Sequence, residues 1–129
     1  KIIFLQKKNF DSSFELISII LILYLKNFKD INSSKYKKIN DLLIKNFIND
    51  LDKSIRDTGV GDMSIGKHVK AYVKKFYYRI KQIDLILKNY NKVDFINYLN
   101  SIKNIDKNLT SLLEIKMMNI YGEIKKIRN

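Results

Sequence analysis

The residues of this chain that could carry chemistry gather in one short segment, Arg56 to Lys67. It holds three of the four glycines, Gly59, Gly61 and Gly66, ahead of a predicted helix. Glycines before a helix can cradle a phosphate, because the first N–H groups of the helix point toward the anion. The spacing matches neither G-x-G-x-x-G nor G-x-x-x-x-G-K-S/T, and no predicted strand precedes it. We therefore interpret the segment as a joint between two helices, with Gly59 in the left-handed conformation that ends a helix.

The other candidates for catalysis or metal binding are sparse. His68 is the only histidine and cysteine is absent, so a zinc motif lacks ligands. Asp52 and Arg56 stand at i and i+4, the spacing of an ion pair on one helix. Asp62 or Ser64 is expected to cap the helix after the joint. Because no residues form a set of nucleophile, base and orienting group, the sequence predicts no enzyme, no metal and no cofactor.

Helices must position these residues, because a chain of 129 residues with no proline and four glycines lacks the turns of a β-sandwich. The apolar run Leu16 to Leu25 lies between Glu15 and Lys26 and is shorter than the roughly 20 residues that span a membrane. It also lacks the cleavage site of a signal peptide. We expect it to form a buried core helix over about 12–28.

Hydrophobic periodicity predicts the remaining helices. One covers 35–58, the longest covers about 64–91, a short one capped by Asp94 ends near Ile102, and the last begins near Asp106. The longest helix turns one face to the core, including Phe76, and the last uses Leu109, Leu113, Met117, Ile120, Ile124 and Ile127. Five lysines lie on the opposite side of the longest helix: Lys67, Lys70, Lys74, Lys81 and Lys88. The prediction is a single all-α domain over residues 1–129, with about five helices.

The net charge of +12 suggests an anionic partner, but composition weakens this signal. Ile, Lys and Asn make up 58 of 129 residues, and all three have adenine- and thymine-rich codons. The charge is uneven, since residues 67–129 carry 14 basic and 5 acidic groups against 11 and 8 in residues 1–66. A basic module that binds RNA, the ribosome or an anionic membrane therefore stays open as an alternative. The chain begins at Lys1 without Met, so we expect an upstream piece.

A resemblance adds to these patterns. The residues that carry it are Asp52-Lys53-Ser54-Ile55-Arg56-Asp57-Thr58-Gly59-Val60-Gly61-Asp62, Ile65-Gly66-Lys67-His68-Val69-Lys70, Phe76-Tyr77-Tyr78-Arg79, Asp84 and Leu87. They make the segment Leu51 to Leu87 similar to the ubiquinol–cytochrome c chaperone family, which includes mitochondrial and α-proteobacterial factors that assemble complex III. With Phe14-Glu15-Leu16 the similarity covers about residues 11–90. The chain departs from the family pattern at Ile20, Asp57 and Tyr78, where the family has His, Glu and Gly.

The resemblance implies an assembly chaperone without chemistry or a small-molecule substrate. Its client would be newly synthesised cytochrome b, and it would support haemylation and incorporation into complex III. The further partners implied are a second assembly factor, the ribosome and a peripheral membrane contact. The implied location is the cytoplasmic face of the inner membrane in a bacterium, or the matrix of a mitochondrion.

The motif positions and the helical phase give a set of candidate contact residues for the client: Asp52, Arg56, Gly59, Gly61, Asp62, Lys67, Lys70, Lys74, Tyr77 and Arg79. Two of the three arginines fall in this set, which indicates a need for planar bidentate donors. The alternative, that Asp52, Arg56 and Arg79 tie helices together, stays open. Lys67, Lys70 and Lys74 are the better interaction candidates because the helical phase exposes them.

Overall fold

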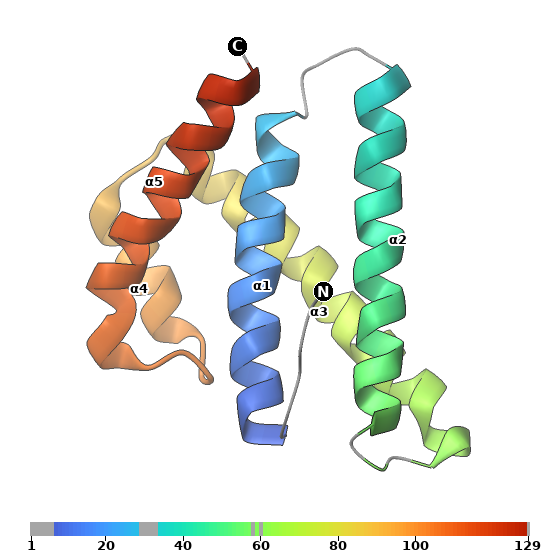
Figure 1. The fold of residues 1–129 in the computed structure, drawn as a ribbon. Helices are drawn as coiled ribbons and strands as arrows, with labels where there is room; N and C mark the ends of the chain where they lie inside the picture. Colours follow the sequence, from blue (N-terminus) through green and yellow to red (C-terminus); the bar gives the residue numbers. More distant parts are fainter. Residues whose placement is uncertain (1–6, 29–33, 58, 60, 129) are drawn as a thin grey trace.

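The computed structural model describes residues 7–28, 34–57, 59 and 61–128. Their elements are α1 (Lys7–Asn27), α2 (Ser34–Asp57), α3 (Asp62–Lys88), α4 (Lys92–Ser101), the 3₁₀ turn η1 (Lys107–Leu109) and α5 (Thr110–Arg128) (Figure 1). This part of the chain contains no strand, so the all-α prediction with five helices is confirmed. Thr58, the predicted last residue of the second helix, lies outside the described residues.

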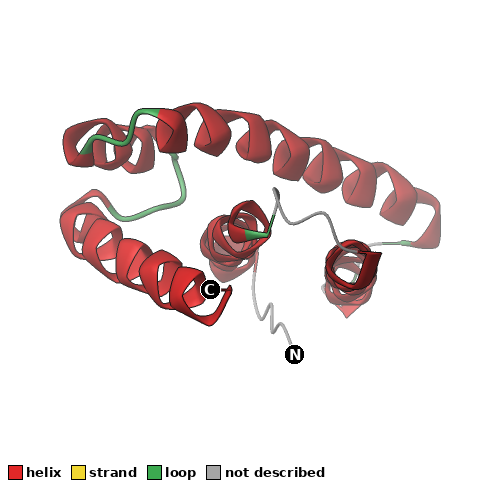
Figure 2. Ribbon diagram, turned by 90° about the horizontal axis from the view of Figure 1, so that it is seen from above, coloured by secondary structure: helices red, strands yellow, loops and turns green. Residues whose placement is uncertain are grey.

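The helices form two layers. α5, α1 and α2 stand side by side, and α3 crosses behind them obliquely (Figure 1). The view from above shows α3 along one side of the molecule (Figure 2). α3 packs against both α1 and α2, and α5 packs against α1 and α4, whereas α1 and α2 make few direct contacts with each other. α1 is therefore the central element, and α2 is held mainly through α3.

The apolar run of α1 is buried on one face only. Ile20 is exposed, whereas Ile19, Ile22 and Leu23 of the run and the preceding Phe14 are fully buried, as expected of a core helix. They belong to one core with side chains of every other helix, because α1 meets partners on several sides. In the part of the chain that the structure describes, no helix is long and apolar enough to cross a membrane.

α3 confirms the strongest periodicity in the sequence. Ile65, Phe76 and Ile83 lie in the core. The five lysines predicted on the opposite side are all exposed. The helix ends at Lys88, before the predicted residue 91, and Tyr90 is accordingly more exposed than a core position.

Two predicted helix caps are wrong. α3 begins at Asp62 with Gly61 as its N-cap, and no side chain caps it. The Ser64 N–H donates to the Gly61 carbonyl instead. α4 is capped by Asn91, not Asp94, because the helix starts earlier and the Asn91 side chain accepts from the Val93 and Asp94 N–H groups.

The predicted apolar stripe of the last helix is only partly buried. Met117 lies in the core, but Leu109, Ile120 and Ile127 are exposed. Thr110 and Glu114 take core-facing positions instead. Thr110 donates to Asn100, and Glu114 accepts from Tyr90 and pairs with Lys92, so hydrogen bonds compensate for burying these polar groups.

Candidate functional site

The glycine segment forms the corner between α2 and α3. Gly59 has φ 89°, and its N–H donates to the Arg56 carbonyl over 3.1 Å. A residue in the left-handed conformation just after a helix lets the following backbone bond to carbonyls that have lost their helical partners. Glycine adopts this conformation without steric strain. The expectation for Gly59 is confirmed. Gly61 has φ −64°, a conformation open to any residue.

Arg56 closes this corner on the surface. Its Nε donates to Asp52 over 2.6 Å and its Nη1 donates to Asp62 over 3.1 Å. The hydrogen bond and the charge of Asp52 raise the pKa of Arg56. The Arg56 side chain is 51% exposed, so water screens both ion pairs. The motif residues Asp52, Arg56 and Asp62 are thus brought together, and they bind one another across the joint.

Arg79 lies inside the molecule and binds Glu15 of α1. Its Nε and Nη2 donate to the two carboxylate oxygens over 3.0 and 2.9 Å. The Glu15 side chain is 2% exposed and that of Arg79 is 13% exposed. A planar fork on a buried carboxylate is a strong, directional contact, and lysine could not reproduce it.

Two further side chains complete this buried cluster. The Arg79 Nη1 and the Tyr98 hydroxyl both donate to the Gln82 Oε1, over 3.0 and 2.9 Å. Burial, opposed by Arg79, raises the pKa of Tyr98 to about 12. Burial lowers the pKa of Arg79, but the hydrogen bond that Arg79 donates to Glu15 and the electrostatic interactions with Tyr98 and Glu15 together outweigh it and leave that pKa raised. The cluster joins α1, α3 and α4, which supports the interpretation that Arg79 ties helices together.

Sequence reasoning missed Glu15, Gln82 and Tyr98 as members of this cluster. Glu15 carried a usable signal, because it is the only acidic residue at the head of a long apolar run. A carboxylate in that position needs a buried cation or several donors. Gln82 and Tyr98 carried no such signal, since their partnership depends on how α4 packs.

The exposed side of α3, which we call the α3 flank, combines cationic and apolar side chains. It consists of Met63, Lys67, Lys70, Lys74, Tyr77, Tyr78, Lys81 and Leu85. All eight are exposed and fall within one sector of the helix, opposite its core face. The acidic residues of α3 are engaged, since Asp62 pairs with Arg56 and Asp84 pairs with Lys26. The flank therefore presents a positive field with exposed aromatic and aliphatic groups.

Gly61 and Gly66 stand where the corner meets the flank. A Cβ added to either would meet no atom within 4 Å. Gly66 is the fifth residue of α3, inside the helix, where glycine costs about 1 kcal/mol relative to alanine. The packing of the described residues thus gives no reason for glycine at these positions, and the surface beside Lys67 is unusually open.

The remaining candidates for chemistry stay apart. His68 is exposed on α3. Among the described residues no group of three or more His, Cys, Asp or Glu side chains could hold a metal ion. What the structure assembles is a corner between two helices, a buried polar cluster and an exposed cationic flank.

Comparison with known families identifies the class of this protein. The family model described as Ubiquinol-cytochrome C chaperone matches residues 4–94, well over half of the chain, and the chain belongs to this family. The match spans α1 to α3 and ends early in α4. No curated protein and no solved structure matches the chain. Membership gives a chaperone role in the assembly of complex III, which implies a protein client and a non-catalytic role.

Proposed function

We propose that this chain binds newly synthesised cytochrome b, supports its haemylation and promotes its incorporation into ubiquinol–cytochrome c reductase. Membership of the chaperone family supports a client in complex III. The observation that carries the proposal is the α3 flank, which lies in the matched region and exposes Lys67, Lys70, Lys74 and Tyr77 together. Charged groups orient a partner, and aromatic groups supply contact area.

The corner and the buried cluster have a supporting part in this proposal. Arg56 fixes the angle at which α3 leaves α2, and Arg79 fixes α3 against α1. Asp52, Arg56, Gly59, Asp62 and Arg79 then act by holding the flank in place. Gly61 and Gly66 leave room for the backbone of a client to approach the start of α3.

A charge-reversal experiment tests the flank. The triple variant Lys67→Glu/Lys70→Glu/Lys74→Glu is compared with a control of equal charge change, Lys103→Glu/Lys107→Glu/Lys116→Glu, whose lysines are also exposed. Tagged proteins are used to capture cytochrome b from solubilised membranes. We expect the flank variant to capture roughly tenfold less client, and the control to resemble wild type. Equal capture by both variants would contradict the proposed surface.

Gly66→Ala separates a role in binding from a role in folding. The added Cβ has space, so the variant should be stabilised by up to about 1 kcal/mol, measured by urea unfolding. If the client backbone approaches here, capture of cytochrome b falls although the fold is stronger. Unchanged capture would remove Gly66 from the contact.

The haemylation part of the proposal needs a separate readout. In cells that lack the chain we expect normal levels of cytochrome b transcript, together with loss of the absorbance of b-type haem and of assembled complex III. The flank variant should reproduce this loss and the charge-matched control should restore assembly. Normal haem absorbance in the deletion strain would refute the chaperone role in haemylation.

We further propose a peripheral contact with anionic lipid through the same flank. Lysines attract anionic headgroups, while exposed Tyr77, Tyr78 and Leu85 suit the interface between headgroups and acyl chains. This would hold the chaperone where its client enters the membrane, on the cytoplasmic face in a bacterium or the matrix face in a mitochondrion. Flotation with anionic vesicles should weaken steeply as salt rises. Retention on neutral vesicles at high salt would indicate hydrophobic insertion instead.

A further inference from the structure

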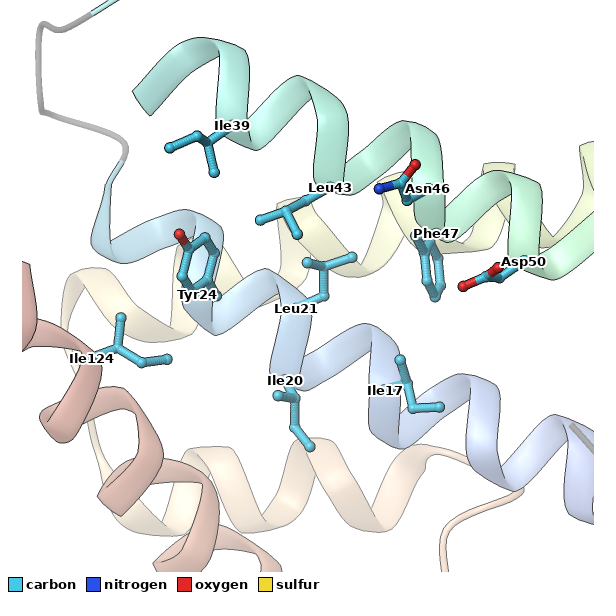
Figure 3. Close-up of a pocket in the computed structure, with 10 residues that line it drawn as sticks. All are labelled: Ile17, Ile20, Leu21, Tyr24, Ile39, Leu43, Asn46, Phe47, Asp50 and Ile124. Atoms are coloured by element: carbon cyan, nitrogen blue, oxygen red, sulfur yellow. The ribbon is translucent and has the colours of Figure 1, made fainter. Parts of the chain in front are cut away.

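A groove opens between α1 and α2 (Figure 3). α3 crosses behind these two helices (Figure 1), and its exposed flank lies opposite the face that packs on them. Both helices rest on α3 but make few contacts with each other. Phe14 and Phe47 stack across the gap at 6.1 Å and Phe47 meets Phe76 at 5.0 Å, so aromatic rings connect the two walls to the core. The volume of the groove is about 590 Å³. Its lining residues are Ile17, Ile20, Leu21, Tyr24, Ile39, Leu43, Asn46, Phe47, Asp50 and Ile124.

The lining follows helical spacing on both walls. α1 contributes residues at i, i+3, i+4 and i+7 from Ile17, and α2 contributes residues at i, i+4, i+7, i+8 and i+11 from Ile39. The wall of α2 therefore extends for about 16 Å, or three helical turns. Figure 3 shows Leu21 of α1 and Leu43 and Phe47 of α2 directed into the gap between the two helices, while Ile20 points away from α2. Ile20 and Ile124 of α5 extend the lining beyond the gap itself. Ile20 is 39% exposed there, which is high for an isoleucine on the central helix of the fold.

The charge of the groove differs from that of the rest of the chain. Lysine and arginine make up 25 of 129 residues, yet neither occurs among the ten described residues that line it. The single acidic residue in the lining is Asp50, beside Asn46 on α2. A groove that excludes cations in so basic a protein, and places one carboxylate on its wall, complements an apolar partner that carries a positive group of its own.

We propose that the groove binds an apolar α-helix of the client, with a basic residue of that helix paired to Asp50. This inference rests on the proposed function, because a membrane-protein client exposes apolar helices before it is assembled. A helix with apolar residues at i, i+3, i+4 and i+7 would pack between the two walls, the usual mode of helix-in-groove recognition. The α3 flank, on the other side, stays free for charged surfaces.

The shape favours a helix over a small molecule or a second copy of the chain. A small ligand usually has most of its surface buried, whereas this groove is open along its length. A second copy would bring +12 more charge to the same assembly. A client helix needs only one side covered, because its other side can contact the rest of the client.

The probe is a fluorescein-labelled peptide of about 18 residues, long enough to form a helix, with leucines at i, i+3, i+4 and i+7 and one arginine at its N-terminal end. Binding to the full chain is measured by anisotropy. Ile20→Lys places a cation in the groove, and Leu112→Lys is the control, since Leu112 of α5 is 50% exposed and belongs neither to the groove lining nor to the α3 flank. We expect Ile20→Lys to weaken binding roughly tenfold or more and Leu112→Lys to leave it unchanged. Circular dichroism verifies that both variants fold.

Asp50→Asn tests the charge without disturbing the apolar walls. It should weaken binding of the arginine peptide several-fold and leave binding of a peptide with glutamine in that place unchanged. Equal effects on both peptides would overturn the assigned pairing with Asp50.

Three results would overturn the groove as a helix site: no binding by wild type, equal binding by Ile20→Lys and Leu112→Lys, or laurate binding that Ile20→Lys abolishes while the peptide never binds. A wild-type dimer that Ile20→Lys dissociates in sedimentation would also overturn it, in favour of a second copy. If the peptide binds in the groove but cytochrome b is not captured, the groove inference stands and the proposed client is wrong.

Discussion

Arg56 and Arg79 are both family-motif arginines with carboxylate partners, yet their surroundings differ. Arg56 holds Asp52 and Asp62 on the surface, with a side chain 51% exposed. Arg79 holds Glu15 in the interior, with both carboxylate oxygens engaged. Because water competes for the first cluster and is excluded from the second, the two should contribute very differently to stability.

The comparison also separates two ways of placing the α3 flank. The exposed cluster bridges a corner that Gly59 already shapes through its backbone. The buried cluster joins α1, α3 and α4 through side chains alone. The backbone at Gly59 supports the corner independently of Arg56, whereas among the described residues no cation other than Arg79 pairs with Glu15. Removing the arginine should therefore destabilise the fold much more in the buried pair than in the exposed pair, although the two pairs are chemically similar.

Arg79→Ala should have the largest effect. It leaves the Glu15 carboxylate buried without its cation, which costs about 3–5 kcal/mol of unfolding free energy. Urea unfolding followed by circular dichroism measures this loss. The double variant Glu15→Met/Arg79→Met removes both charges and should recover much of it. A single variant that loses less than about 1 kcal/mol would contradict the view that the buried cluster is the stronger of the two.

Gly59→Ala should have the next largest effect and acts on the exposed corner. The residue has φ 89°, and a left-handed alanine is strained by about 1–2 kcal/mol. The added Cβ meets no atom within 4 Å, so backbone strain alone accounts for the loss. Gly61→Ala, at φ −64°, is the matched control and should leave the unfolding free energy nearly unchanged. Equal losses in the two variants would show that the corner is not shaped by Gly59.

Tyr98→Phe tests the buried cluster through pH. The pKa of Tyr98 is about 12 in the folded chain against 10.0 ordinarily, so its contribution is complete below pH 10 and is lost as pH rises toward 12. Wild type should therefore lose stability across this window more steeply than the variant. Below pH 10 the free energy of unfolding of the variant should be lower than that of wild type by about 1 kcal/mol, because the variant lacks the hydrogen bond from Tyr98 to Gln82. If the unfolding free energies of wild type and variant change in parallel with pH, the pKa of Tyr98 does not differ between the folded and the unfolded chain.

The spacing of apolar residues predicted α2 and α3, because a long amphipathic helix repeats this spacing over many turns. The left-handed Gly59 and the Asp52–Arg56 ion pair could also be predicted from the sequence, since each depends on residues close together along the chain. The resemblance gave the family, and the family match bears it out. Local chemistry was therefore sufficient for the end of α2, but not for the start of α3, where neither Asp62 nor Ser64 caps the helix.

Tertiary contacts account for what the sequence did not show. Glu15 and Arg79 are 64 residues apart, and nothing local links them. On α5 the polar residues Thr110 and Glu114 face the core because they bind Asn100, Tyr90 and Lys92. The apolar stripe predicted for this helix is therefore buried only in part, with Met117 in the core. The groove depends on α1 and α2 being held apart by α3, a spacing that no pattern within either helix encodes.

Arg56→Ala should have the smallest effect on stability of the four. The side chain is half exposed, and both ion pairs are screened by salt, so the unfolding midpoint should move far less than in Arg79→Ala. The small difference from wild type should shrink further as salt rises, as expected of surface pairs. Capture of cytochrome b gives the sharper readout, because a corner whose angle is less well fixed presents Lys67 and Lys70 less accurately. Reduced capture with an unchanged midpoint would show that the exposed cluster orients the flank, while a midpoint shift as large as that of Arg79→Ala would erase the distinction between the two arginines.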